Sequence, residues 1–179
     1  MKIVKGDILN ATEDFILQQC NCLTVKAHGL SETLGNKFPH ARVYNHRKPI
    51  SQHAYGSNIA IEVDRAIPGT AVICTGVPGI ICLFSQWRPG KITAPYFDYY
   101  PESNPRETEL QRLLWFISSL TQVGEYFRHQ CSGKNFSIAI PNRIGCGLAG
   151  GNWEKYFKVL QQFEEKYKAI LTLTIYDLS

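Results

Sequence analysis

The stretch from Ile138 to Glu154 constrains the fold more than any other part of the sequence. A strand-like apolar run passes through a loop with four glycines before an amphipathic helical pattern begins at Trp153. Glycine lacks a Cβ, so such a loop can adopt positive φ angles and approach a ligand closely, and unpaired N–H groups at the following helix start attract negative charge. The pattern indicates a site for a phosphorylated small molecule, although many α/β proteins use a similar loop merely to turn a corner.

The same loop excludes several classes of nucleotide-binding protein. It contains neither the G-x-x-x-x-G-K-[ST] phosphate loop nor the G-x-G-x-x-G dinucleotide pattern. A kinase, a GTPase or an ordinary dehydrogenase is therefore not expected.

Length and composition predict a single domain over residues 1–179. The chain is 44% hydrophobic and 12% aromatic, enough for one well-buried core and too short for two large ones. No run of about 18 apolar residues occurs, and the first residues carry no hydrophobic signal segment. We expect a cytoplasmic protein, with the nucleus as the alternative, and no membrane partner.

The cysteines predict free thiols. Four of the six lie in or beside apolar runs, which suits buried thiols in a reducing compartment: Cys20, Cys74, Cys82 and Cys146. The pair Cys20-x-Cys22 has no C-x-x-C spacing and no second cluster, so neither a metal site nor a cofactor is expected.

The net charge of +4 leaves nucleic acid as a secondary partner. A solvated helix face explains the charges more simply, because aromatic residues are not regularly interleaved with them. The basic residues concerned are Lys37, Arg42, Arg47 and Lys48, with His40, His46 and His53 nearby.

Strand and helix patterns alternate along most of the chain. β-branched and apolar runs bounded by turn residues predict strands at 2–4, 15–20, 71–74, 79–84, 136–140 and 171–176. Apolar residues at helical spacing predict helices at 29–38, from 106 onward and from 153 onward, with a short helix up to Arg47 and a long loop over 87–105. In the helix after 106 the apolar stripe is formed by Leu110, Leu113, Leu114, Ile117 and Leu120. The alternation predicts an α/β fold in three layers, with helices on both faces of a mixed sheet.

Three loops follow strands directly and are expected to face one cleft, since ligands bind beyond the carboxyl ends of strands in such sheets. We call them the first loop (residues 21–29), the second loop (142–151) and the third loop (85–90).

In their order along the chain, these motifs resemble the macrodomain family of ADP-ribose-binding modules over nearly the whole sequence. Lys5-Gly6-Asp7-Ile8 is similar to the family's first motif, Gln19-Cys20-Asn21-Cys22 with Gly29 to its first ligand loop, and Gly145-Cys146-Gly147-Leu148 to its second. The segment I-G-C-G-L is typical of the branch with ADP-ribose 1″-phosphate phosphatases and deacylating or DNA-deribosylating hydrolases.

The resemblance implies a role for each motif residue. Asp7 would accept a hydrogen bond from the adenine amino group, assisted by the Ile8 backbone, and Asn21 would hold the distal ribose. Their alternatives are a turn aspartate and a buried amide bonded to backbone. The diphosphate would be wrapped by Val25, Gly29, Leu30, Ile144, Gly145, Cys146, Gly147 and Leu148, and the distal ribose bordered by Phe84, Ser85 and Gln86.

The sequence also departs from the family. The first loop has Thr24-Val25-Lys26-Ala27-His28 where the family is richer in glycine, and Ala149 stands where the deacylating branch has aspartate. Gln18 replaces the histidine of some phosphatase relatives, and Phe84-Ser85-Gln86-Trp87 lacks the lysine of deribosylating relatives.

Two functions remain open. One is a hydrolase of ADP-ribose 1″-phosphate or of an ADP-ribosyl conjugate, with Asn21 positioning the substrate and His28 as the candidate base. The other is a non-catalytic reader of ADP-ribose, alone or on a partner. A nucleophilic Cys146 is a weaker alternative, because the family uses this position as a packed thiol.

Overall fold

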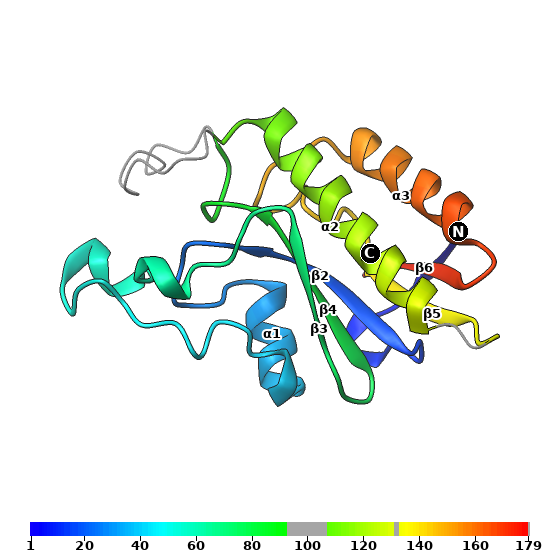
Figure 1. Ribbon diagram of the computed structural model, residues 1–179, viewed down its shortest axis with the longest axis horizontal. Helices are drawn as coiled ribbons and strands as arrows, with labels where there is room; N and C mark the ends of the chain where they lie inside the picture. Colours follow the sequence, from blue (N-terminus) through cyan, green and yellow to red (C-terminus); the bar gives the residue numbers. More distant parts are fainter. Residues whose placement is uncertain (93–106, 131–132, 179) are drawn as a thin grey trace.

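The computed structural model describes residues 1–92, 107–130 and 133–178. Within them six strands form one sheet in the order β1-β6-β5-β2-β4-β3 (Figure 1). Five strands run parallel, and only β3 is antiparallel, to its neighbour β4. The strands are β1 (Lys2–Lys5), β2 (Phe15–Asn21), β3 (Thr70–Cys74), β4 (Gly79–Gln86), β5 (Phe136–Pro141) and β6 (Leu171–Asp177).

Helices cover both faces of the sheet, which confirms the predicted three-layer α/β architecture. Helix α1 (Leu30–Lys37) lies on one face, and α2 (Glu109–Gln130) and α3 (Trp153–Tyr167) lie side by side on the other (Figure 1). Alternate strand residues serve the two layers: Ile81 and Leu83 pack toward α2 and α3, whereas Ile80 and Cys82 pack toward α1. Every residue of β4 is buried, as expected for a strand covered on both faces.

Helix α2 forms as predicted, but only part of its apolar stripe is buried: Leu120 lies in the core and Leu113 packs against it. Leu110, Leu114 and Ile117 are 65%, 48% and 39% exposed. The buried face instead carries Arg112, Trp115, Phe116, Ser119, Leu120, Val123, Gly124 and Phe127. Both sets satisfy helical spacing, and the set with the larger aromatic rings removes more apolar area from water.

The short helix predicted up to Arg47 is wrong. Only Pro39–Ala41 forms a 3-10 helix, and turns follow. Arg47 is 4% exposed and donates from Nη1 to the carbonyls of Asn21 (3.2 Å) and Thr24 (2.7 Å). Arg47 therefore belongs to the interior and not to a solvated basic face.

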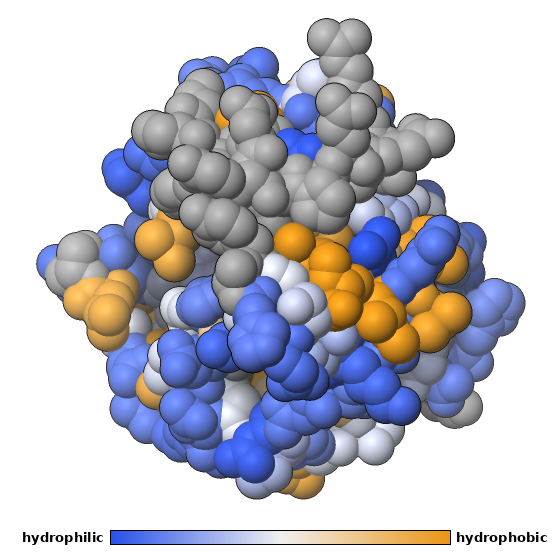
Figure 2. Space-filling view, turned by 90° about the vertical axis from the view of Figure 1, so that its left-hand side faces the viewer, coloured by the Kyte–Doolittle hydropathy of each residue, from blue (hydrophilic) through white to orange (hydrophobic). Residues whose placement is uncertain are grey.

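The molecular surface is largely polar on the face shown in Figure 2, where apolar side chains also gather in a patch. Within the described ranges, no helix is both long and apolar enough to span a membrane.

Candidate functional site

The sheet topology brings the three loops to one edge. Strands β5, β2 and β4 are parallel neighbours, so the second, first and third loops leave the sheet side by side. Between them lies a cavity of about 290 Å³, which we call the main cavity. A wider one of about 820 Å³, the outer cavity, lies at the ends of β1, β5 and β6. The two share Leu30, Pro141, Asn142 and Arg143 and so form one long groove.

The second loop is shaped by positions that exclude a side chain. Gly145 has φ +72°, and a Cβ added there would lie 2.5 Å from Gln19 Oε1 and 2.7 Å from Tyr156 Cε1. The loop closes on itself through the Gly151 N–H, which donates to the Gly145 carbonyl at 2.9 Å. Within the described residues, the N–H groups of Gly145, Gly147, Leu148 and Ala149 have no hydrogen-bond partner. Such a set of free donors suits an anion.

The first loop is held by the Asn21 side chain. Its Oδ1 accepts from the Leu23 N–H (3.0 Å) and the Thr24 N–H (2.8 Å), and its Nδ2 donates to Thr24 Oγ1 (2.8 Å). Arg47 stacks 4.4 Å above the Tyr44 ring beneath this loop, and burial lowers the pKa of its guanidinium. Asn21 lines the main cavity, but its amide is already engaged within the loop.

At the end of the first loop the chain meets the second loop. Gly29 has φ +58°, and an added Cβ would lie 3.1 Å from Leu148 Cδ1. The N–H groups of His28, Gly29 and Leu30 have no partner among the described residues; His28 and Leu30 line the main cavity, whereas Gly29 does not. His28 is exposed and lines the main cavity, whereas Val25 lines only a neighbouring hollow of about 330 Å³.

Of the three residues predicted to border the distal ribose, only Gln86 lines the main cavity. Phe84 and Ser85 are 4% and 0% exposed and do not line the groove, because β4 buries both of its faces. Gln86 lines the main cavity, accepts from Gln19 Nε2 at 2.7 Å and donates to the Arg88 carbonyl at 3.0 Å. The floor of the main cavity is thus an amide pair from β2 and β4.

Asp7 and Ile8 line the outer cavity. Asp7 caps the 3-10 helix η1 (Ile8–Asn10), and its Oδ1 accepts from the Leu9 N–H at 2.9 Å. Only one carboxylate oxygen is used in this cap, so the other is available to a donor on a ligand.

Cys146 is a packed thiol. Burial raises its pKa to about 11, its Sγ donates to the Ile144 carbonyl at 3.3 Å, and it does not line the main cavity. At neutral pH this group is a thiol and not a thiolate nucleophile.

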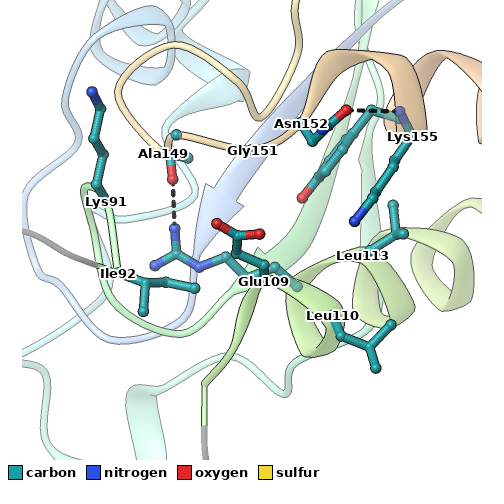
Figure 3. Close-up of a pocket in the computed structure, with 12 residues that line it drawn as sticks. Lys91, Ile92, Glu109, Leu110, Leu113, Ala149, Gly151, Asn152 and Lys155 are labelled. Carbon is teal, nitrogen blue, oxygen red and sulfur yellow. Dashed lines mark hydrogen bonds between the residues drawn. The ribbon is translucent and has the colours of Figure 1, made fainter.

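Sequence reasoning missed a buried ion pair behind the groove. Arg112 Nε donates to Glu107 Oε1 at 2.7 Å, with both side chains almost fully buried. The guanidinium also reaches the Ala149 carbonyl, a contact drawn in Figure 3 beside a small cavity of about 70 Å³ behind the second loop. An arginine between Gln111 and Leu113 in a helical pattern gives no sequence signal of this role.

The described residues that line the main cavity include no aspartate or glutamate, and His28 is the only histidine among them. Nor do the described parts of the chain bring together three or more His, Cys, Asp or Glu side chains that could hold a metal ion.

Comparison with known proteins identifies the fold. No family model matches the sequence, and no curated protein matches it either. Among solved structures, the macrodomain of Mycobacterium tuberculosis DarG is similar over 99% of this chain and 97% of its own, with a TM-score of 0.64 and 15% identity.

Two further structures agree. The macrodomain of Thermus aquaticus DarG matches 98% of this chain and 97% of its own (TM-score 0.60, 15% identity). The Trypanosoma brucei macrodomain in complex with ADP matches 99% of this chain and 63% of its own (TM-score 0.59, 10% identity). The sheet, its helices and the similarity over nearly the whole chain agree on one conclusion: this chain has the macrodomain fold.

Proposed function

We propose that the groove binds ADP-ribose, with the adenosine in the outer cavity beside Asp7 and the distal ribose in the main cavity. The observation that carries the proposal is two sets of N–H groups that have no partner among the described residues: those of His28, Gly29 and Leu30 at one wall of the main cavity, and those of Gly145, Gly147, Leu148 and Ala149 at the other. A diphosphate between two sugars places its negative charge at such a position. The relative solved with ADP supports this assignment by analogy.

The exposed Arg143 adds a cation at the same position. It lines both cavities and adopts φ +57°, a conformation that costs a non-glycine residue of the order of 1 kcal/mol. Strain of this kind concentrates at functional sites, and here it holds a positive side chain beside the proposed diphosphate.

Isothermal titration with ADP-ribose, and with AMP and ATP as controls, tests the proposal. We expect micromolar affinity for ADP-ribose and weaker binding of AMP, which lacks the diphosphate and distal ribose. Equal or absent binding of all three ligands would contradict it.

We further propose that the bound molecule is hydrolysed, as ADP-ribose 1″-phosphate or as an ADP-ribosyl conjugate, with His28 assisting proton transfer. His28 supports this because it is the only histidine lining the main cavity among the described residues. The competing function is a non-catalytic reader, and the lack of any carboxylate among the described residues that line that cavity favours it.

Phosphate release from ADP-ribose 1″-phosphate separates these two functions. Turnover that His28→Gln abolishes, with ADP-ribose affinity retained, supports the hydrolase. Tight binding without product selects the reader or a hydrolase of another conjugate, and assays with ADP-ribosylated protein and nucleic acid then distinguish those two.

A further inference from the structure

The buried pair Glu107–Arg112 stands directly behind the main cavity. Arg112 is 2% exposed and Glu107 is 9% exposed, and the two side chains neutralise each other. Burying two charges is costly unless nearly all of their hydrogen-bonding groups are satisfied, so the remaining partners of the pair reveal what it holds in place.

Glu107 binds N–H groups of the third-loop backbone, and Arg112 binds carbonyl groups of the same segment. The Glu107 carboxylate accepts from the N–H groups of Trp87 (2.7 Å) and Arg88 (3.1 Å). Arg112 donates to the carbonyls of Arg88 (3.1 Å) and Gly90 (2.8 Å). The segment from 87 to 90 is therefore fixed by one ion pair.

The same guanidinium also reaches the second loop. Arg112 Nη1 donates to the Ala149 carbonyl at 3.0 Å (Figure 3). Gly90 and Ala149 both line the main cavity. From the Arg88 carbonyl the network continues through Gln86 to Gln19 on the cavity floor. One buried side chain thus joins two walls and, through them, the floor.

We infer that Arg112 is a positioning residue that sets the separation of the second and third loops at the distal end of the groove. The inference rests on the proposed function and identifies the half of the ligand that it controls. A guanidinium suits the task because it directs five donors from a rigid plane, whereas lysine directs three donors from one atom and cannot serve four separated acceptors.

Arg112→Lys and Arg112→Met test the role through two ligands. We expect ADP-ribose affinity to fall about tenfold or more in both variants, while AMP affinity changes less than about twofold, because AMP occupies the Asp7 end. An equal loss of affinity for both ligands would show that Arg112 contributes only to general stability, and would overturn the inference. Unchanged ADP-ribose affinity would overturn it as well.

A matched control removes another buried polar contact of the same helix. Ser119 Oγ donates to the Trp115 carbonyl at 2.7 Å and lies away from the groove. Ser119→Ala should leave the ratio of ADP-ribose to AMP affinity unchanged. A change in that ratio equal to that of Arg112→Lys would overturn the inference.

Hydrogen exchange provides a readout that needs no ligand and therefore separates this inference from the proposed function. In Arg112→Lys, the hydrogen-bonded amides of Trp87 and Arg88 in the third loop and of Gly150 and Gly151 in the second loop should all exchange faster than in the unsubstituted protein, while those of α1 do not. Faster exchange in only one of the two loops, or equally in α1, would show that Arg112 does not couple them.

Discussion

The two walls of the groove are built by opposite means. The first loop depends on side chains: the Asn21 amide bonds to Leu23 and Thr24, and Arg47 bonds to its carbonyls from below. The second loop depends on the absence of a side chain at Gly145 and on Arg112, which contacts it from a distant helix. Removing a side chain within the loop should therefore damage the first loop, whereas adding one within the loop, at Gly145, should damage the second.

The comparison also explains why both walls present free N–H groups. In the first loop, side chains satisfy Leu23 and Thr24, and the unpaired donors begin only near Gly29, where α1 starts. In the second loop, the turn at Gly145 leaves donors unpaired within the loop itself. Two different local structures therefore both present unpaired N–H groups, which favour an anion.

Gly145→Ala should have the largest effect. The added methyl group would contact Gln19 Oε1 and the Tyr156 ring at a positive φ, so we expect ADP-ribose affinity to fall at least about 100-fold in isothermal titration. Gly133→Ala is the matched control, because Gly133 also has a positive φ (+82°) but nothing within 4 Å of the added Cβ. Similar losses of ADP-ribose affinity in both variants would mean that backbone strain at positive φ, and not the shape of the groove, causes the effect.

Asn21→Ala tests the first wall. It leaves the buried N–H groups of Leu23 and Thr24 unpaired, which should lower the free energy of unfolding by about 2 kcal/mol in urea titration. Asn21→Asp keeps both acceptor contacts and should cost less than half as much. If aspartate were as damaging as alanine, the loop would depend on the amide donor instead.

Thiol reactivity tests how tightly the second loop is packed. A hydrogen bond with Cys82 lowers the pKa of Cys74 to about 7, whereas burial raises that of Cys146 to about 11. At pH 8 iodoacetamide should modify Cys74 at least about tenfold faster, and raising the pH to about 10 should accelerate only Cys146 strongly. Peptide mapping measures each site, and equal rates at pH 8 would contradict a packed second loop.

His28→Ala should have the smallest effect on binding. The side chain is exposed on the first wall, so we expect the Kd for ADP-ribose to change less than about threefold and the unfolding free energy by less than about 0.5 kcal/mol. A larger loss of affinity, measured by titration, would show that the imidazole contacts the ligand directly.

The sequence allowed the fold and the three loops to be predicted because they follow from local patterns. Apolar runs marked the strands, and their alternation with helices placed the loop ends together at one edge. Asp7, Asn21, His28, Leu30 and Gln86 do line the groove, as do Ile144, Gly145, Gly147 and Leu148.

The remaining site residues could not be predicted because they depend on which way a helix or strand faces. Leu110 and Phe116 fit helical stripes equally well, and only packing shows that the stripe with Phe116 is buried. That orientation also carries Arg112 inward to Ala149. Phe84 and Ser85 lie too deep for the groove because β4 is covered on both faces, which a motif match does not reveal.

The division of the groove into two adjoining cavities has a consequence for affinity. Leu30, Pro141, Asn142 and Arg143 belong to both cavities, so each half of a dumbbell-shaped ligand would occupy its own compartment. Either half alone would bind weakly, whereas joining them makes the second encounter intramolecular, at an effective concentration in the millimolar range. Affinity would then depend on the distance between the two sugars of the ligand as much as on the chemical groups at either end.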